Sequence, residues 1–268
     1  MDSTASELLK TGDPAGALKV LQEEVRAQPQ DAKLRVFLFQ LLCVLGQWER
    51  ALNQLNAAAQ LDAAALAMAQ MYREAIRCEL LRAKVFEGAT APMVFGQPEE
   101  WLALLIESLQ LSGRAKGNEA AELRARALDR AAATTGAVDD RPFEWIADAD
   151  SRLGPVLEAI INGRYYWVPF VRLTKIVIEQ PVDLRDVVWM PVHLEFTNGG
   201  ESVALVPTRY PGSELSADPQ ILLARKTVWV EAAPDTYHGF GQRLLTTDAG
   251  DSALMDVRAI AFAQSVTT

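Results

Sequence analysis

Carboxylates gather in the middle of the chain, where they could supply hard oxygen ligands for a divalent cation. Asp148 and Asp150 lie in the run DADSR, with Glu144 before it and Glu158 after it. Such oxygen donors are those that Ca²⁺ and Mg²⁺ prefer. An EF-hand loop counted from Asp148 would, however, need glycine at its sixth position and glutamate at its twelfth, and this chain has neither there. The sequence therefore predicts no metal site of that kind.

The same residues have a structural interpretation, which we favour. Asp148, Asp150 and Ser151 are of the types that enter a helix or cap the N–H groups of a turn. Arg152 is placed to pair with a nearby carboxylate and to tie this junction to a sheet. The aromatic residues expected to anchor the segment between the two halves of the chain are Phe143 and Trp145.

Acid–base chemistry has few candidates, because the chain contains two histidines. His193 alternates with apolar neighbours in MPVHLEF, which predicts that it points outward from a strand, and His238 lies in a turn-like run. The sequence has no Gly-x-Ser-x-Gly, no phosphate-binding Gly-rich loop and no dinucleotide fingerprint. We expect no enzymatic activity and no cofactor; the alternative is a metal-dependent or hydrolytic enzyme using Asp148, Asp150 and His193.

The two cysteines, Cys43 and Cys78, lie inside helical patterns without a CxxC partner. A disulfide framework or a zinc cluster needs more ligands than these. Both are expected to be small core residues.

The overall charge excludes some classes of partner. The 268 residues carry a formal net charge of −9. Phosphate backbones and anionic lipid attract basic surfaces, so neither nucleic acid nor a membrane surface is an expected partner. The start MDSTASELLK has no basic segment followed by an apolar run, and no stretch is long enough for a membrane helix. These features indicate a cytoplasmic protein.

The chain begins with a repeat. GDPAGAL starts at Gly12 and GQWERAL at Gly46, so Gly, Ala and Leu recur at an offset of 34 residues. This is the repeat length of the tetratricopeptide helical hairpin. The composition to about residue 135 is rich in helix formers. Two hairpins bury little surface alone, and the segment from Asp62 to Phe86 is the expected capping helix.

From Arg164 onward, β-branched and aromatic residues stand in short runs between Pro, Gly and Asn, which is typical of strands. Asn198-Gly199-Gly200 indicates a hairpin turn. The predicted fold class is α+β, with tetratricopeptide-like helices over residues 1–135. A smaller, mainly antiparallel β-rich domain with an entry helix is predicted over residues 136–268.

The most distinctive segment is RPFEWIADADSRLGPVLEAIINGRYYWVPF, Arg141 to Phe170. With the upstream repeats and the later LVPTRYPGSE, it resembles the ImpE/TagJ family of type VI secretion accessory proteins over essentially the whole chain. The resemblance implies a non-enzymatic adaptor. Its implied partners are the N-terminal part of the small sheath subunit, TssB or VipA, and the ClpV unfoldase, which recycles the contracted sheath.

A stack of helical hairpins can receive a partner helix in its concave face. Val36, Gln40, Cys43 and Val44 lie on one side of the third helix and are candidate groove residues. The alternative is that this stripe packs within the chain. A generic tetratricopeptide co-chaperone, which would hold an acidic tail through basic groove residues, has only Lys33 and Arg35 to offer.

Overall fold

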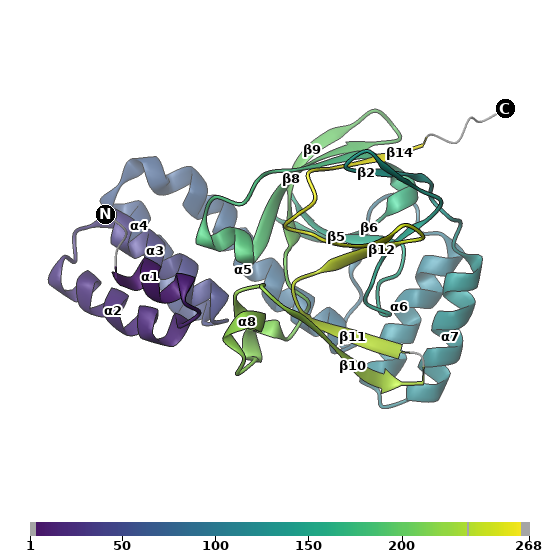
Figure 1. Ribbon diagram of the computed structural model, residues 1–268, viewed down its shortest axis with the longest axis horizontal. Coiled ribbons are helices and arrows are strands. Elements are labelled where there is room, and N and C mark those ends of the chain that lie inside the picture. Colours follow the sequence, from purple (N-terminus) through teal and green to yellow (C-terminus); the bar gives the residue numbers. More distant parts are fainter. Residues whose placement is uncertain (1–3, 235, 264–268) are drawn as a thin grey trace.

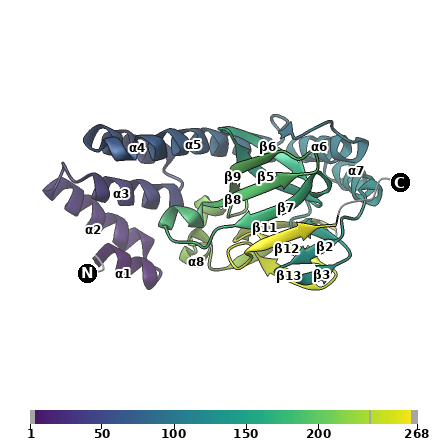
Figure 2. The same ribbon diagram turned by 90° about the horizontal axis from the view of Figure 1, so that it is seen from above.

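Two helical hairpins begin the computed structural model, which describes residues 4–234 and 236–263. The hairpins and the helix after them are α1 (Thr4–Lys10), α2 (Pro14–Ala27), α3 (Ala32–Val44), α4 (Trp48–Leu61) and α5 (Leu66–Phe86). The two hairpins form one end of the molecule, and α5 runs from them to the sheet (Figure 1). Figure 2 shows α4 and α5 following one another along one side.

The turns of the two hairpins have the same geometry at the offset of 34 residues. Gly12 and Gly46 both have positive φ, at 87° and 65°. The amide of Gly12 donates to the carbonyl of Leu9, and that of Gly46 donates to Cys43. Ala17 and Ala51 are both fully buried where the paired helices approach. The repeated sequence thus produces a repeated local structure, as expected from glycine's tolerance of the left-handed region.

A second helical pair, α6 (Glu100–Gly113) and α7 (Gly117–Arg130), precedes most of the strands. Pro98 and Glu99 lead into α6, and Ser108 donates from its hydroxyl to the carbonyl of Ala120 across the pair. Among the described residues, no helix is both long and apolar enough to cross a bilayer.

The main sheet has nine strands and is antiparallel except for its first pair. In spatial order the strands are β1 (Met93–Val94), β6 (Arg164–Pro169), β5 (Val156–Ile161), β9 (Glu201–Pro207), β8 (Trp189–Phe196), β7 (Leu173–Ile178), β14 (Ala259–Phe262), β2 (Gly136–Val138) and β3 (Arg141–Phe143). The predicted turn at Asn198-Gly199-Gly200 joins β8 to β9, with Gly199 at a φ of 80°.

Two smaller sheets complete the fold. One contains β13 (Gly250–Ala253), β12 (Leu244–Thr247) and β4 (Ile146–Asp148). The other is a ribbon of β10 (Thr227–Ala233) and β11 (Thr236–Gly241), preceded by the short helix α8 (Pro219–Leu222). The predicted α+β class, with helices first and an antiparallel-rich sheet second, is confirmed.

The two faces of the main sheet have separate cores. One face packs on the helices, where Trp189 contacts Trp48 and Tyr72 at ring-centroid distances of 6.0 and 5.6 Å. The other face encloses a second core with the small sheet, around Ile161, Val168 and neighbouring aliphatic residues, and this core includes Ile260 and Phe262 of β14. Because one core joins the helices to the sheet, the two parts are held together by direct apolar packing. The division of the chain at residue 135 stays a prediction.

The entry helix predicted in the second half is absent from the described structure. Asp148 ends β4, and Asp150 and Ser151 lie in a turn before β5. β5 is buried along its whole length because it has a core on each face. Its sequence, VLEAII, therefore lacks the alternation that reveals a half-exposed strand, and such a run can be mistaken for a helix.

Candidate partner-binding site and its support

The four residues predicted to line the groove of the hairpins lie mostly in the core. Gln40, Cys43 and Val44 are buried, and Val36 is half-buried. Arg209 donates from Nη1 to the carbonyl of Val44 at 2.8 Å, so a later part of the chain covers this end of α3. Burial raises the pKa of the Cys43 thiol well above its usual range. Three of the four residues therefore pack within the chain, as in the alternative to a groove. Only Val36 has a partly exposed side chain that a partner could contact.

The two basic residues that a co-chaperone would use, Lys33 and Arg35, have different surroundings. Lys33 is exposed on α3, whereas Arg35 donates from Nη1 to Gln54 and from Nε to the carbonyl of Pro29. A guanidinium that is already bonded to α4 and to the preceding turn is not arranged as a clamp for an acidic tail. No observation favours that function.

The predicted junction residues differ in burial. Phe143 is buried and packs on Phe262, whereas Trp145 is 40% exposed, and the anchoring role of both stays a prediction. Asp150 is bonded to the guanidinium of Arg152 and accepts from its backbone amide at 2.9 Å. Asp148 likewise accepts from the amide of Asp150 at 2.9 Å. These carboxylates cap a turn and pair with arginine.

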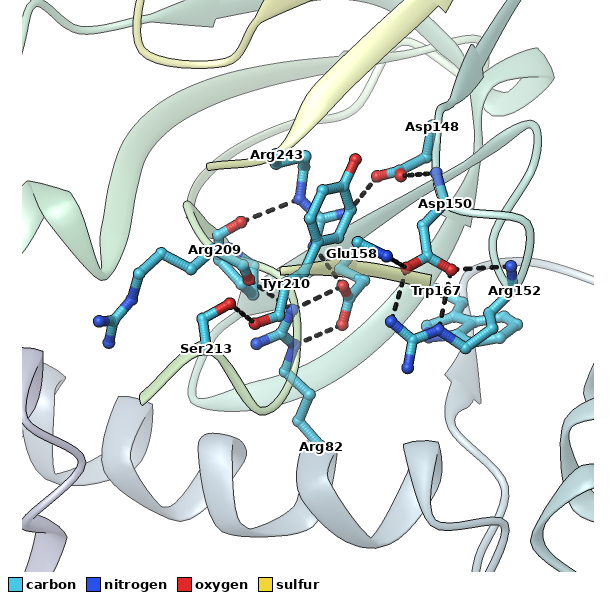
Figure 3. Close-up of polar contacts among 12 residues, drawn as sticks. Arg82, Asp148, Asp150, Arg152, Glu158, Trp167, Arg209, Tyr210, Ser213 and Arg243 are labelled. Atoms are coloured by element: carbon cyan, nitrogen blue, oxygen red, sulfur yellow. Dashed lines mark hydrogen bonds and ion pairs between the residues drawn. The ribbon is translucent and has the colours of Figure 1, made fainter. Parts of the chain in front are cut away.

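A buried ionic network joins α5 to the sheet, and Figure 3 shows its centre at Glu158. Arg82 of α5 donates from Nε and Nη2 to the two oxygens of Glu158, at 2.6 and 2.9 Å. On the other side, Arg243 bonds to both Glu158 and Asp148. All four side chains are buried, so two arginines and two carboxylates balance each other's charge in the core.

Further groups complete the hydrogen bonding of this network. Tyr165 donates its hydroxyl to Glu158, and the indole of Trp167 donates to Tyr165 at 2.8 Å. Arg82 also donates to the carbonyl of Arg209 at 2.8 Å. Glu79, one turn before Arg82 on α5, pairs with Arg82 and accepts from the indole of Trp189 at 2.9 Å. These hydrogen bonds are needed because a buried charge without a partner lowers the stability of the fold.

The two carboxylates on Arg243 have opposite pKa shifts. Burial alone would raise the pKa of Glu158, but Arg82 and Arg243 outweigh it and lower this pKa to about 2. For Asp148, burial dominates over the attraction of Arg243 and raises the pKa to about 6. The difference follows from geometry, since Glu158 contacts two guanidinium groups and Asp148 contacts one.

The structure does not bring the residues of the enzyme alternative together. Asp148 is paired with Arg243, and Asp150 with Arg152. His193 lies half-exposed on β8 and contacts Glu201 at 3.1 Å. Within residues 4–234 and 236–263, no group of three or more His, Cys, Asp and Glu side chains is arranged to hold a metal ion.

An open apolar groove lies between α5 and the edge of β9. Its volume is about 420 Å³. One wall is formed by four residues of α5 at helical spacing, Ala67, Gln70, Met71 and Glu74. The other wall and the floor come from the sheet, namely Ile160, Asn162, Gly163, Val203, Ala204 and Leu205. Met71 is 44% exposed and Val203 is 66% exposed, so large apolar side chains face solvent on both sides of it.

The walls of the groove are in contact with one another. The turn between β5 and β6 packs directly on α5, where a Cβ added at Gly163 would lie 3.0 Å from Glu74 Cγ. The Cys78 thiol donates to the carbonyl of Gly163 at 3.5 Å. A glycine here permits the close approach, since its φ is +72° and no side chain intervenes. Sequence reasoning missed this groove because its walls come from segments about 90 to 140 residues apart in the chain.

Comparison with known proteins agrees with the fold. The model of the ImpE protein family matches residues 140–261. The chain is 50% identical over 258 residues to the type VI secretion system accessory component TagJ of Pseudomonas aeruginosa, covering 96% of this chain and 90% of that protein. The crystal structure of protein VPA1032 from Vibrio parahaemolyticus superimposes with a TM-score of 0.89 at 25% identity, covering 98% of this chain and 99% of that one.

Proposed function

Because the chain belongs to the ImpE/TagJ family, we propose that it is an accessory protein of a type VI secretion system that acts as a non-enzymatic adaptor. In this proposal it binds the N-terminal segment of the small sheath subunit, TssB or VipA, and links it to sheath recycling by ClpV in the cytoplasm. The observation that carries the accessory role is the 50% identity to TagJ along 96% of the chain. The particular partners are those implied by the family resemblance.

We place the sheath segment in the α5–β9 groove. Three of the four α3 residues first expected to bind it are buried, so they have no side-chain surface to offer. The α5–β9 groove, in contrast, is concave, apolar and open. Amphipathic segments dock by inserting apolar side chains into grooves of this kind, with polar groups at the rim fixing their orientation.

The groove suits a short segment of a partner. Met71 and Val203 form apolar contacts on its two sides, while Gln70, Glu74 and Asn162 supply polar groups. Its volume of about 420 Å³ accommodates a few side chains and not a folded domain. The contacts between α5 and the turn at Gly163 hold the walls in place, so binding needs little reorganisation.

Titration of a labelled N-terminal peptide of the co-encoded small sheath subunit tests this function. Met71→Asp is expected to weaken peptide binding by at least about tenfold, because a carboxylate would be desolvated among apolar groups. Leu215→Asp is the matched control, since Leu215 is 85% exposed and lies outside the groove lining. Equal affinities for wild type and Met71→Asp would exclude the groove, and no binding by wild type would exclude the peptide.

The link to ClpV needs a separate experiment. Affinity purification of the tagged protein from cells that express the secretion system, followed by mass spectrometry, is expected to enrich both the sheath subunits and the unfoldase. If both are missing while other proteins are enriched, the adaptor function is wrong.

A further inference from the structure

A second groove lies between the first hairpin and the sheet half of the chain. Its volume is about 670 Å³, and Leu9 of α1 forms part of its wall. Most of the rest comes from the segments before β8, after α8 and before β14, with Leu184 and Met255 among its apolar residues. Two arginines, Arg225 and Arg258, also line it, and we call it the arginine groove. It combines apolar surface with two positive charges from separate segments.

Both arginines are held by backbone carbonyls. Arg225 donates from Nη2 to the carbonyl of Leu9 at 2.9 Å and from Nη1 to that of Lys10 at 3.1 Å. Arg258 donates from its two Nη atoms to carbonyls of its own segment, at 2.5 and 2.6 Å. Among the described residues, no carboxylate forms an ion pair with either guanidinium group. A carbonyl orients a guanidinium group but carries no net charge, so both arginines stay positively charged and fixed in position.

The second hairpin has an equivalent contact, but there the arginine is covered. Arg209 donates from Nη2 and Nη1 to the carbonyls of Cys43 and Val44, which lie 34 residues after the two that Arg225 contacts. Arg209 is 4% exposed, and its Nη1 also donates to the carbonyl of Leu222. Arg225 is exposed in the arginine groove. Its remaining N–H groups are therefore accessible to a ligand, whereas Arg209 serves the fold alone.

The charge of the arginine groove favours an acidic ligand. Its one carboxylate is that of Asp256, so the two arginines leave the lining with a net positive charge. The chain as a whole has the opposite sign, with a formal net charge of −9. A carboxylate can accept two parallel hydrogen bonds from a guanidinium group. The apolar part of the lining suits an aliphatic side chain beside such a carboxylate.

A nucleotide fits the arginine groove less well than a peptide does. The described residues that line it include no aromatic side chain, so a base would have no ring on which to stack. They also include no glycine, whereas loops that hold phosphate groups through successive backbone amides are rich in glycine. The lining therefore favours carboxylates over phosphates.

We infer that the arginine groove binds an acidic segment of a partner protein. The carboxylates of this segment pair with Arg225 and Arg258, and a neighbouring aliphatic side chain packs on Leu184 and Met255. The volume admits a few residues of a peptide and not a folded domain. Arginines that converge on an acidic motif are a recurring mode of peptide recognition.

This inference is independent of the proposed sheath-binding function. The α5–β9 groove and the arginine groove share no lining residue. A substitution in one groove therefore leaves the other unchanged, and each site can fail without the other.

Fluorescence anisotropy with a labelled peptide of sequence ELDLE, blocked at both ends, tests the inference. The peptide QLNLQ is its matched control, because it has nearly the same shape without the carboxylates. ELDLE is expected to bind at least about tenfold more tightly than QLNLQ. The difference should shrink as the salt concentration rises, because ions screen exposed charges.

Variants assign the binding to the arginine groove. Arg258→Gln should weaken ELDLE binding at least about tenfold, and Arg126→Gln, at an exposed arginine of α7 outside the lining, should leave it unchanged. Asp256→Asn removes a carboxylate that repels the ligand, so it should strengthen binding about twofold to fivefold. Asp129→Asn, at an exposed position of α7, is its control. Misfolding cannot produce such a gain.

Three results would overturn the inference. The first is equal binding of ELDLE and QLNLQ, and the second is an equal loss for Arg258→Gln and Arg126→Gln. The third is unchanged or weaker binding by Asp256→Asn. The fluorescent nucleotide mant-ATP serves as a further probe, and its binding in the absence of ELDLE binding would identify a phosphate site in place of the inferred one.

Discussion

The two ends of α5 differ in what they do with the same sheet. Toward its C-terminus, Glu79 and Arg82 enter a buried network with Glu158, and the helix is tied to β5 by paired charges. Toward its N-terminus, Ala67, Gln70 and Met71 border an open groove beside β9. One end of the helix is covered by the chain itself, and the other borders the groove in which we propose that a partner binds.

This difference shows how one helix can support the fold and present a surface. A buried ion pair adds little net stability compared with apolar packing, but removing one partner is severe. The charges at the C-terminal end therefore fix the position of α5 relative to the sheet. Because the position of α5 relative to the sheet is fixed, the wall that α5 contributes to the groove at its N-terminal end is fixed as well.

The largest expected loss of stability comes from removing a charge from the buried network at the C-terminal end of α5. Glu158→Gln removes the charge that Arg82 and Arg243 share, and leaves two buried guanidinium groups with one carboxylate fewer. We expect the free energy of unfolding to fall by about 3–5 kcal/mol. Urea denaturation measures it. Glu119→Gln, in an exposed pair with Lys116, is the control, and a loss below about 1 kcal/mol for Glu158→Gln would contradict the role of the network.

The pH dependence of stability tests the protonation of Asp148 in the same buried network. The pKa of Asp148 is raised to about 6 by burial, above its unfolded value. Its stabilising contribution is therefore complete below the unfolded pKa and is lost as pH rises through about 6. The unfolding free energy of wild type minus that of Asp148→Asn should fall by about 2–3 kcal/mol between acidic and neutral pH. A constant difference would show that Asp148 is not perturbed.

At the open end, substitutions should affect binding and leave the fold unchanged. Val203 is 66% exposed, so Val203→Asp should change the free energy of unfolding by less than about 0.5 kcal/mol. The same change should weaken binding of the sheath peptide at least about tenfold, because it places a carboxylate in the apolar wall. Urea denaturation and peptide titration on one sample separate the two effects. A large loss of stability would mean that this wall is part of the core.

The smallest effect is expected at the surface pair beside the groove. Arg77 contacts Glu74 at 2.7 Å, but 72% of the arginine side chain is exposed. Arg77→Ala should lower the free energy of unfolding by at most about 0.5 kcal/mol. Thermal unfolding measures this change. If Arg77→Ala lowered the free energy of unfolding as much as Glu158→Gln, the two ends of α5 would not differ in their contribution to stability.

The helical half was predictable because its signals are local. The offset of 34 residues places Gly12 and Gly46 at equivalent turns, and the helix expected from Asp62 to Phe86 is observed as α5. α3 was harder, because its C-terminal half is buried on every side and Gln40 is its one polar residue. Periodicity cannot then separate a groove face from a core face.

The network and the groove depend on tertiary contacts and were not predictable in the same way. Glu158 interrupts an apolar run, which hints at a buried charge, but nothing local identifies Arg82 or Arg243 as its partners, 76 and 85 residues away. Trp167 and Trp189 are fully buried, whereas Trp229 is partly exposed on the ribbon. Its strand pattern does not reveal that one edge stays open.

Site-specific photo-crosslinking on α5 tests the central contrast most directly. A photoreactive residue is placed at position 71, in the groove, or at position 80, where Leu80 is 50% exposed on the same helix but outside the groove lining. With the co-expressed small sheath subunit, the account predicts a cross-linked product from position 71 and little from position 80. Equal products from both positions, or a product from position 80 alone, would contradict it.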